Sequence, residues 1–500
     1  MNIETESLYQ YIAASMTDGQ LPNEFSLPQH SNENELKWMD GALDGVSIFH
    51  MGYSDIKEET KALMEKAINA ASETDTDKAD ELFFQLGQKA RAIAVIDELQ
   101  SYIIKNKEIL SANGLYHYAV HVILDSADKE SVKFGLSLLE LFHIDDNEKL
   151  KAVVRILGLS DEFSIFAIFV MLQWNEGNKE IFELAKKIHG WGRIHAIERL
   201  EPTTEEIKQW LLREGVHNEI MAAYSALVCW QKIDGEEILQ GSLSREDFSG
   251  IRDIIEGLLN EGPIPGISQI ENAPEMILIF LDKAKNMELT LKDYEVVRAI
   301  RVYYENEKKK NSSIVDLCQE ILQTDTCRNF VKEAVNNGTY LELADDLKID
   351  YKDELLLILK TEFQERYFLA NYLIDDARYR PEVFTIFNQN LSLDDMKTLP
   401  TNTLGLGPDY KAQQQLECIV QKLKQYPLEG IEFVRTALQS APVRTRNLGL
   451  HVLQDWVNMR GISLHELLPD MHTILCHLRD IEVDDKAQNL MDNLIRGDFE

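Results

Sequence analysis

The residues around Trp191 have side chains that could transfer a proton or bind a metal. His195 and Glu198 are three positions apart, so on a helix they would share a face, and His189 lies just before the tryptophan. An imidazole beside a carboxylate suits either kind of chemistry. A di-iron centre, however, needs Glu-x-x-His on two helices plus two further glutamates, whereas this cluster offers one His-x-x-Glu.

We therefore predict a small polar binding site here, on the concave face of a helical array, and leave the catalytic residues unknown. The alternative, which is the more common role of such residues, is structural: their polar groups form hydrogen bonds at the polar edge of a helix turn. The predicted binding residues are His189, Trp191, Arg193, His195, Glu198 and Arg199.

Two other pairs have the four-residue spacing of zinc ligands on a helix. His117 and His121 form the first, but Tyr118 stands where the metalloprotease pattern requires glutamate. His472 and Cys476 form the second. Neither pair has an evident third ligand to complete a tetrahedron, so we predict packed or hydrogen-bonded side chains and no metal.

Motifs for nucleotide, haem and nucleophile chemistry are missing from the sequence. It contains no GxxxxGK[ST], GxSxG, HExxH or CxxCH pattern, and residues 405–407 lack the third glycine of a dinucleotide loop. The five cysteines lie in ordinary helical contexts rather than in a glycine-rich haem-thiolate loop. These absences predict no cofactor and favour a protein that is not an enzyme.

The elements that would position these residues are repeated helices. Residues 192–200 and 445–453 both have a basic residue, a small residue three positions later and a leucine four beyond it, and residues 132–139 match more loosely. A small residue lets a neighbouring helix approach, and the leucine fills the seam between them. Because strand alternation is absent as well, we predict an all-α fold, an irregular HEAT-like helical-repeat solenoid or α-α superhelix.

Clusters of proline, glycine and polar residues divide the predicted array. Trp38 and Phe49 indicate that the irregular N-terminal part packs back onto the helices, where we expect it to cap the exposed seam. The predicted divisions are an N-terminal capping segment at 1–55, a helical-repeat block at 56–257, a loop or hinge at 258–274, a helical-repeat block at 275–398, a loop at 399–409 and a C-terminal HEAT-like block at 410–500.

Local patterns also predict individual helices and their first residues. Apolar spacings of three and four indicate helices at 76–87, 88–105 and 291–309, among others. Two serine or threonine residues precede a glutamate by three positions, the pattern of a capping box. They are Thr203 with Glu206 and Ser463 with Glu466.

Composition limits the partners that we expect. With 51 basic and 85 acidic side chains, the net charge is −34, which repels nucleic acid and favours basic partners. The N-terminus lacks the basic start and apolar core of a signal peptide, and no apolar run approaches the roughly 20 residues that cross a membrane. An odd number of cysteines without a CxxC pair fits reduced thiols. We therefore expect a cytoplasmic protein with no nucleic-acid or membrane partner.

The repeated helices resemble the HEAT-like and armadillo-like superfamily over about residues 130–500. Residues 157–231, including the segments around Trp191 and Trp210, more specifically resemble a family of bacterial proteins, common in Firmicutes, that is often labelled limonene hydroxylase. That resemblance implies a terpene monooxygenase, but no catalytic motif matches, so it implies no catalytic residue. The alkylpurine DNA glycosylases built on HEAT-like repeats are a third comparison, and the acidic balance argues against it.

The favoured hypothesis is a non-catalytic α-solenoid scaffold that binds a protein or peptide, possibly a basic one, on its concave face. A small-molecule hydroxylase of the terpene type is the alternative. A HEAT-like protein that binds DNA is the third. The oligomeric state is left open.

Overall fold

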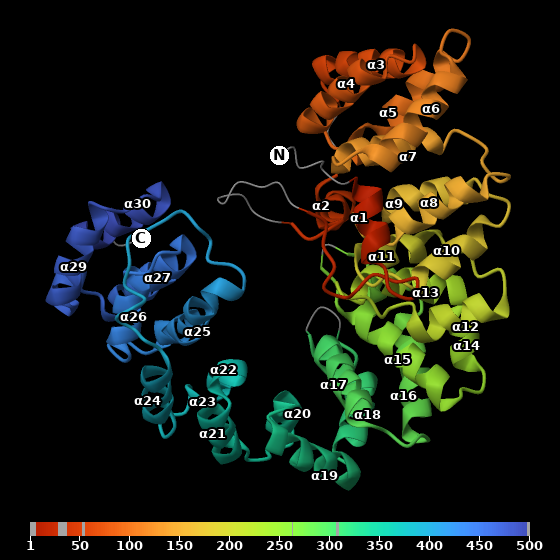
Figure 1. Cartoon of the computed structure of the whole chain (residues 1–500). Coiled ribbons are helices and arrows are strands. Elements are labelled where there is room, and N and C mark those ends of the chain that lie inside the picture. The colour runs from red at the N-terminus through yellow and green to blue at the C-terminus, as the bar shows by residue number, and fades with distance from the viewer. Residues whose placement is uncertain (1–6, 29–37, 53–55, 263, 307–309, 498–500) are drawn as a thin grey trace. The chain divides into compact units, whose positions relative to one another are not determined.

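The computed structural model describes residues 7–28, 38–52, 56–262, 264–306 and 310–497, and every regular element within them is a helix. The one β-feature in these ranges is an isolated bridge between Thr17 and Gln20. The predicted all-α helical-repeat fold is therefore confirmed. The chain divides into two compact units, the first containing the described residues up to Ile321 and the second those from Leu322 onward (Figure 1).

The first unit begins with short N-terminal elements and continues as a run of longer helices. The N-terminal elements are α1 (Leu8–Ser15), α2 (Ala42–Val46) and the π-helix η1 (Ser47–Met51). The run consists of α3 (Glu58–Ser72), α4 (Thr76–Lys89), α5 (Ala92–Lys105), α6 (Ala112–Asp125), α7 (Lys129–Leu139), α8 (Glu148–Gly158), α9 (Ser164–Leu172), α10 (Gly177–Ala185), α11 (Trp191–Arg199), α12 (Glu205–Glu214), α13 (Ala223–Ile233), α14 (Gly235–Gln240), α15 (Arg245–Leu259), the 3-10 turn η2 (Ile267–Gln269), α16 (Ala273–Lys285), α17 (Leu291–Glu305) and α18 (Ser312–Leu322).

Alternate helices of this run stack on one another and form one layer. Helix α7 contacts α5 and α9, α11 contacts α9 and α13, and α15 contacts α13 and α17. The helices between them pack against this layer, for example α8 on α9 and α10 on α11. Helix α9 is apolar around its whole circumference, from Ile165 to Met171, which suits a helix enclosed by neighbours on every side.

The second unit repeats this arrangement with shorter and more broken helices. Contacts link α21 to α23, α23 to α25, α25 to α27 and α27 to α30. Its elements are α19 (Asp325–Ala334), η3 (Val335–Asn337), α20 (Leu341–Asp346), α21 (Lys352–Thr361), α22 (Phe363–Arg366), η4 (Tyr367–Leu369), α23 (Ala370–Leu373), α24 (Arg380–Asn390), η5 (Pro408–Tyr410), α25 (Lys411–Val420), η6 (Gln421–Gln425), α26 (Ile431–Leu438), α27 (Val443–Arg460), α28 (Leu464–Leu467), α29 (Pro469–Arg479) and α30 (Asp485–Arg496).

The small residue of the repeated sequence motif behaves as predicted, and burial of the basic residue is an additional feature. The basic residues of its two clearest copies, Arg193 and Arg446, are buried, and the small residue of the second copy lies against a neighbouring helix. A Cβ added to Gly449 would lie 3.2 Å from Leu438 and 3.3 Å from Ala437, so α26 can approach α27 closely only at a small residue. The Ser463–Glu466 capping box is present, whereas the cap of α12 is one residue later than predicted, at Thr204.

Two predicted boundaries differ from the structure. The N-terminal segment, described here at residues 7–28 and 38–52, does not cap the end of the array: α1 contacts α6 and α8, and α2 packs on α11. Residues 258–274 include a non-helical connection, but they lie inside the first unit because Ile264 and Ile267 are buried there. The division between the units comes instead at Ile321 and Leu322.

Within the described part of the chain, none of the helices combines the length and the apolar content that crossing a membrane requires.

Candidate functional site

The six binding residues predicted from the sequence lie on or beside α11, under the N-terminal segment. Trp191, Arg193 and His195 are between 1% and 5% exposed. His189 is exposed on the loop before the helix, and Glu198 and Arg199 are partly exposed at its end. The structure therefore brings the six together around one short helix, but it encloses three of them instead of presenting them on an open surface.

His195 and Glu198 share a helix face, as their spacing predicts. Nδ1 of His195 lies 3.5 Å from a carboxylate oxygen of Glu198, which also accepts a 3.0 Å hydrogen bond from Arg199. Burial lowers the pKa of His195, so its neutral form is favoured. Burial would raise the pKa of Glu198, but its contacts with His195 and Arg199 outweigh this effect and lower it.

The two remaining buried residues of this set stabilise the packing around α11. Arg193 donates a 2.8 Å hydrogen bond to the carbonyl of Glu214, and its guanidinium lies 4.9 Å from the centre of the Trp210 ring. Trp191 lies edge to face with Tyr224, with ring centroids 4.9 Å apart. These contacts fix α11 against α12 and α13, so the side chains act in packing in this conformation.

Residues 38–52, hereafter the 38–52 segment, cover this cluster. Gly45 lies directly on Trp191, because a Cβ added there would be 2.1 Å from a ring carbon. The ring of Phe49 lies 5.0 Å from that of Tyr224 and 6.1 Å from that of His195. His50 and the Tyr224 hydroxyl are 2.6 Å apart. The chain therefore supplies its own occupant for the surface that the sequence predicts as a binding site.

A buried cluster of charges anchors the same segment. Asp44 is 2% exposed and accepts a 2.7 Å hydrogen bond from Lys133, whose side chain has no exposed area. Lys133 also pairs with Glu130 at 2.9 Å and with Glu162 at 2.5 Å. Although burial opposes ionisation of Glu162, Lys133 and Lys129 lower its pKa to about 2. Arg91 pairs with Asp44 as well, so the carboxylate of Asp44 is held by two cations.

A small pocket of about 80 Å³ lies beside this segment, and His189 lines it. Asp161, which also lines this pocket, accepts a 2.9 Å hydrogen bond from the backbone N–H of Gly192, at the start of α11. Burial, reinforced by repulsion from Asp40 and Glu219, raises the pKa of Asp161 to about 7 even though that hydrogen bond opposes the change. Asp161 therefore caps α11 with a carboxyl group that is partly protonated at neutral pH.

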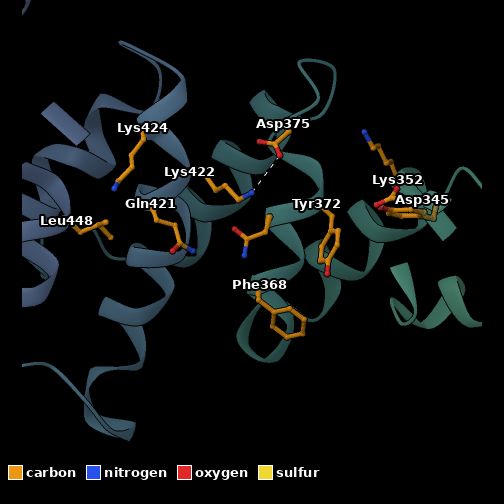
Figure 2. A pocket seen from close by; sticks show the side chains of 11 residues that line it. Asp345, Lys352, Phe368, Tyr372, Asp375, Gln421, Lys422, Lys424 and Leu448 are labelled. Atoms are coloured by element: carbon orange, nitrogen blue, oxygen red, sulfur yellow. Dashed lines mark hydrogen bonds and ion pairs between the residues drawn. The ribbon is translucent and has the colours of Figure 1, made fainter. Parts of the chain in front are cut away.

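An open groove lies in the second unit, formed by two adjoining hollows of about 940 Å³ and 830 Å³. Both hollows are lined by Phe368, Asn371, Gln421 and Leu448, which come from the η4–α23 turn, η6 and α27. Figure 2 shows Phe368 and Tyr372 on one side of the first hollow and Gln421, Lys422 and Lys424 on the other.

Aromatic and amide side chains line part of the groove. Phe368 is 46% exposed, and Tyr367 and Tyr372 line the walls beside it. Asn371 lines both hollows, and its side-chain oxygen has no hydrogen-bond partner within the described residues. Turning this amide towards a ligand therefore breaks no hydrogen bond of that oxygen. The second hollow adds the amides of Gln414 and Asn447.

The charged residues of the groove are largely paired. Lys422 lies 3.6 Å from Asp375, Lys352 pairs with Asp376 at 3.0 Å, and Arg444 pairs with Glu417 at 2.5 Å. The groove therefore has little net charge, in contrast to the strongly acidic chain. The groove therefore offers a ligand hydrogen-bonding amides and aromatic faces, and not an electrostatic potential of one sign.

The two other histidine pairs make ordinary side-chain contacts. His121 lies 3.2 Å from Asp80 and 3.1 Å from Asp125, while His117 stacks edge to face on Tyr116. Sγ of Cys476 lies 3.9 Å from Nδ1 of His472. In the described ranges, no three His, Cys, Asp or Glu side chains are grouped so that they could hold a metal ion.

Neither the groove nor the buried cation was predicted from the sequence. A lysine within the apolar stretch 132–139 is a signal for Lys133, since a charge in a buried helix requires partners. The groove has a weaker signal, the adjacent aromatics Tyr367 and Phe368 followed by the glutamine run at 413–415. Nothing local indicates that these segments lie side by side.

Comparisons with known proteins do not assign a family. No family model matches the chain, and no curated protein matches it. Among solved structures it is similar to a "circular tandem repeat protein with novel repeat topology and enhanced subunit contact surfaces". The identity is 12%, and the match covers 88% of this chain and 94% of the other, with a TM-score of 0.12. A similarity of that strength carries no argument about the site.

Proposed function

We propose that the protein is a non-catalytic helical-repeat scaffold that binds a protein or peptide segment in the groove of its second unit. The observation that carries this proposal is the pair of adjoining hollows with a shared floor of Phe368, Asn371, Gln421 and Leu448. A groove that crosses several successive helices suits an extended ligand better than a compact small molecule.

Recognition would combine hydrogen bonds to a backbone with anchoring of side chains. Amide groups both donate and accept, so Asn371 and Gln421 complement the alternating N–H and C=O groups of a peptide. Phe368 offers an exposed aromatic face, the type of side chain that often dominates binding energy. The acidic surface elsewhere would speed the approach of a basic partner, while the paired charges of the groove add little specificity for charge.

The test is selection of peptides from a displayed random library with the full-length protein. We expect the enriched peptides to lose at least about tenfold in affinity for Phe368→Ala, the loss typical of an aromatic anchor. Phe84→Ala is the matched control, because Phe84 is 50% exposed on α4 of the first unit and lines neither hollow. Peptides that bind both variants equally, or a library from which none is enriched, would contradict the proposal.

The hydroxylase implied by the sequence resemblance is a separate proposal with its own measurement. It requires iron, haem or flavin in protein purified under native conditions, detectable by elemental analysis and absorption. A stoichiometric cofactor would replace the scaffold proposal. DNA binding is tested by a mobility shift at low salt, where phosphate contacts are strongest.

A further inference from the structure

The 38–52 segment lies across a continuous face of the first unit, made by α7, α11, α13 and the turn before α9. Within this face, α2 packs on α11, where Gly45 lies on Trp191. Three positions of the segment meet three different features of that face. Asp44 meets the buried cations, Gly45 meets the flat ring of Trp191, and Phe49 packs against both Trp191 and Tyr224.

Each of these positions is specific for its residue type. A neutral side chain in place of Asp44 would remove a partner of both Lys133 and Arg91. A side chain in place of Gly45 would overlap the Trp191 ring, where the nearest ring atoms lie 2.1 Å and 2.3 Å from the added Cβ. The face therefore recognises a short helical turn with a carboxylate, a glycine next to it and an aromatic four residues after the glycine.

The face keeps its buried charges paired when this segment is taken away. Lys133 retains Glu130 at 2.9 Å and Glu162 at 2.5 Å, and Arg91 retains Glu130 at 3.8 Å. Lys129, which is 26% exposed, keeps Glu162 at 4.0 Å. Breaking a buried ion pair is costly when it leaves a buried charge without a partner. Release of the segment leaves no buried charge of the face in that state.

The uncovered face would also attract an acidic ligand. Three cations, Arg91, Lys129 and Lys133, would then face two carboxylates, Glu130 and Glu162. Asp161 beside Glu162 adds less than one full negative charge at neutral pH, because burial raises its pKa to about 7, so part of a positive charge is left over. On a chain with a net charge of −34, such a local surplus favours a carboxylate ligand at this place.

We propose that this face is a docking site for a short acidic helical segment of a partner protein, one that matches the spacing of Asp44, Gly45 and Phe49, and that the 38–52 segment is its intramolecular competitor. This site is separate from the groove of the second unit and does not depend on the function proposed for that groove. The partner segment would place its carboxylate between Lys133 and Arg91 and its aromatic ring against both Trp191 and Tyr224, where Phe49 lies now.

The test uses the full-length protein and a fluorescently labelled synthetic peptide of residues 38–52 as the probe. In the Gly45→Val chain, the added side chain overlaps Trp191 and drives the tethered segment off the face. We expect the probe to bind this variant at least tenfold more tightly than the wild-type chain. Probes that carry Asp44→Asn or Phe49→Ala should lose that binding, while Ile48→Ala, a neighbouring change, should retain most of it.

Several results would overturn the proposal. One is that the probe binds wild type and Gly45→Val equally, or binds neither chain. Another is that the altered probes bind Gly45→Val as tightly as the unaltered probe does. A third is that the Gly45→Val chain dimerises through its own segment. If Gly45→Val does not fold, amide hydrogen exchange of the wild-type chain tests whether the 38–52 segment leaves the face. Amides of residues 42–51 should then exchange at least a hundredfold faster than those of α11, and equal protection would show that the segment does not leave.

Discussion

Lys133 donates a 2.7 Å hydrogen bond to Asp44, across 89 positions of the sequence and with both side chains buried. This contact joins the N-terminal 38–52 segment to the middle of the helical array. It also explains how a lysine without solvent exposure stays charged, because three carboxylates surround its ammonium group and raise its pKa against the effect of burial. The stability of the first unit therefore depends on this cation.

Replacing Lys133 by methionine should destabilise the first unit by about 3–5 kcal/mol, because three carboxylates lose their common cation while they remain buried. Urea unfolding, followed by circular dichroism, measures the change. Lys186→Met is the matched control, since the Lys186–Glu183 pair is partly exposed and its loss should cost less than about 1 kcal/mol. Equal losses in the two variants would refute the role of the buried cluster.

Asp161→Asn should change how stability depends on pH. The pKa of Asp161 rises from an ordinary value of 3.8 to about 7 in the folded chain, so between these values the folded state binds more protons than the unfolded state. Its contribution to the free energy of unfolding therefore falls as pH rises from 4 to 7, by at most about 4 kcal/mol.

Asparagine keeps an oxygen that can accept the Gly192 N–H but does not titrate. The variant should thus gain stability relative to wild type between pH 5 and pH 7.5, as measured by urea midpoints at the two pH values. Parallel pH profiles for the two proteins would show that Asp161 does not titrate in this range.

Two histidines should titrate in opposite directions. Hydrogen bonds that His217 donates to the carboxylates of Asp253 and Glu214 raise its pKa above the usual 6.5, whereas burial lowers the pKa of His195. Proton NMR of histidine-labelled protein should therefore show that His217 becomes protonated at a higher pH than His195. Protonation of His195 opposes folding as pH falls below 6.5. The reverse order of the two titrations would mean that His195 is more solvated than this packing allows.

Enlarging Gly449 should test the small residue of the repeated motif. Gly449→Leu should destabilise the second unit by about 1–3 kcal/mol, because the side chain would overlap Leu438 and Ala437 of α26. Asn458→Leu, at an exposed position of the same helix, should change stability by less than about 0.5 kcal/mol. Thermal unfolding followed by circular dichroism compares them. A Gly449→Leu protein as stable as its control would show that this contact is not tight.

The local sequence determined most of the helices, because apolar periodicity and capping act over a few residues. The predicted helix at 76–87 is α4 (Thr76–Lys89), and that at 291–309 begins at the same residue as α17 (Leu291–Glu305). Spacing alone also placed His195 and Glu198 on one helix face. The all-α repeat class follows from the same local signals, since each helix has one apolar stripe that must pack on a neighbour.

Tertiary packing decided which residues are accessible. Trp191 and His195 are buried because Gly45 and Phe49 lie on them. No sequence pattern near α11 indicates that a segment so distant in the sequence packs there. The groove arises in the same way. Phe368, Gln421 and Leu448 belong to three separate elements, and their shared surface exists only after those elements stack. Exposure is a property of the whole unit, whereas helix formation is a property of a few turns.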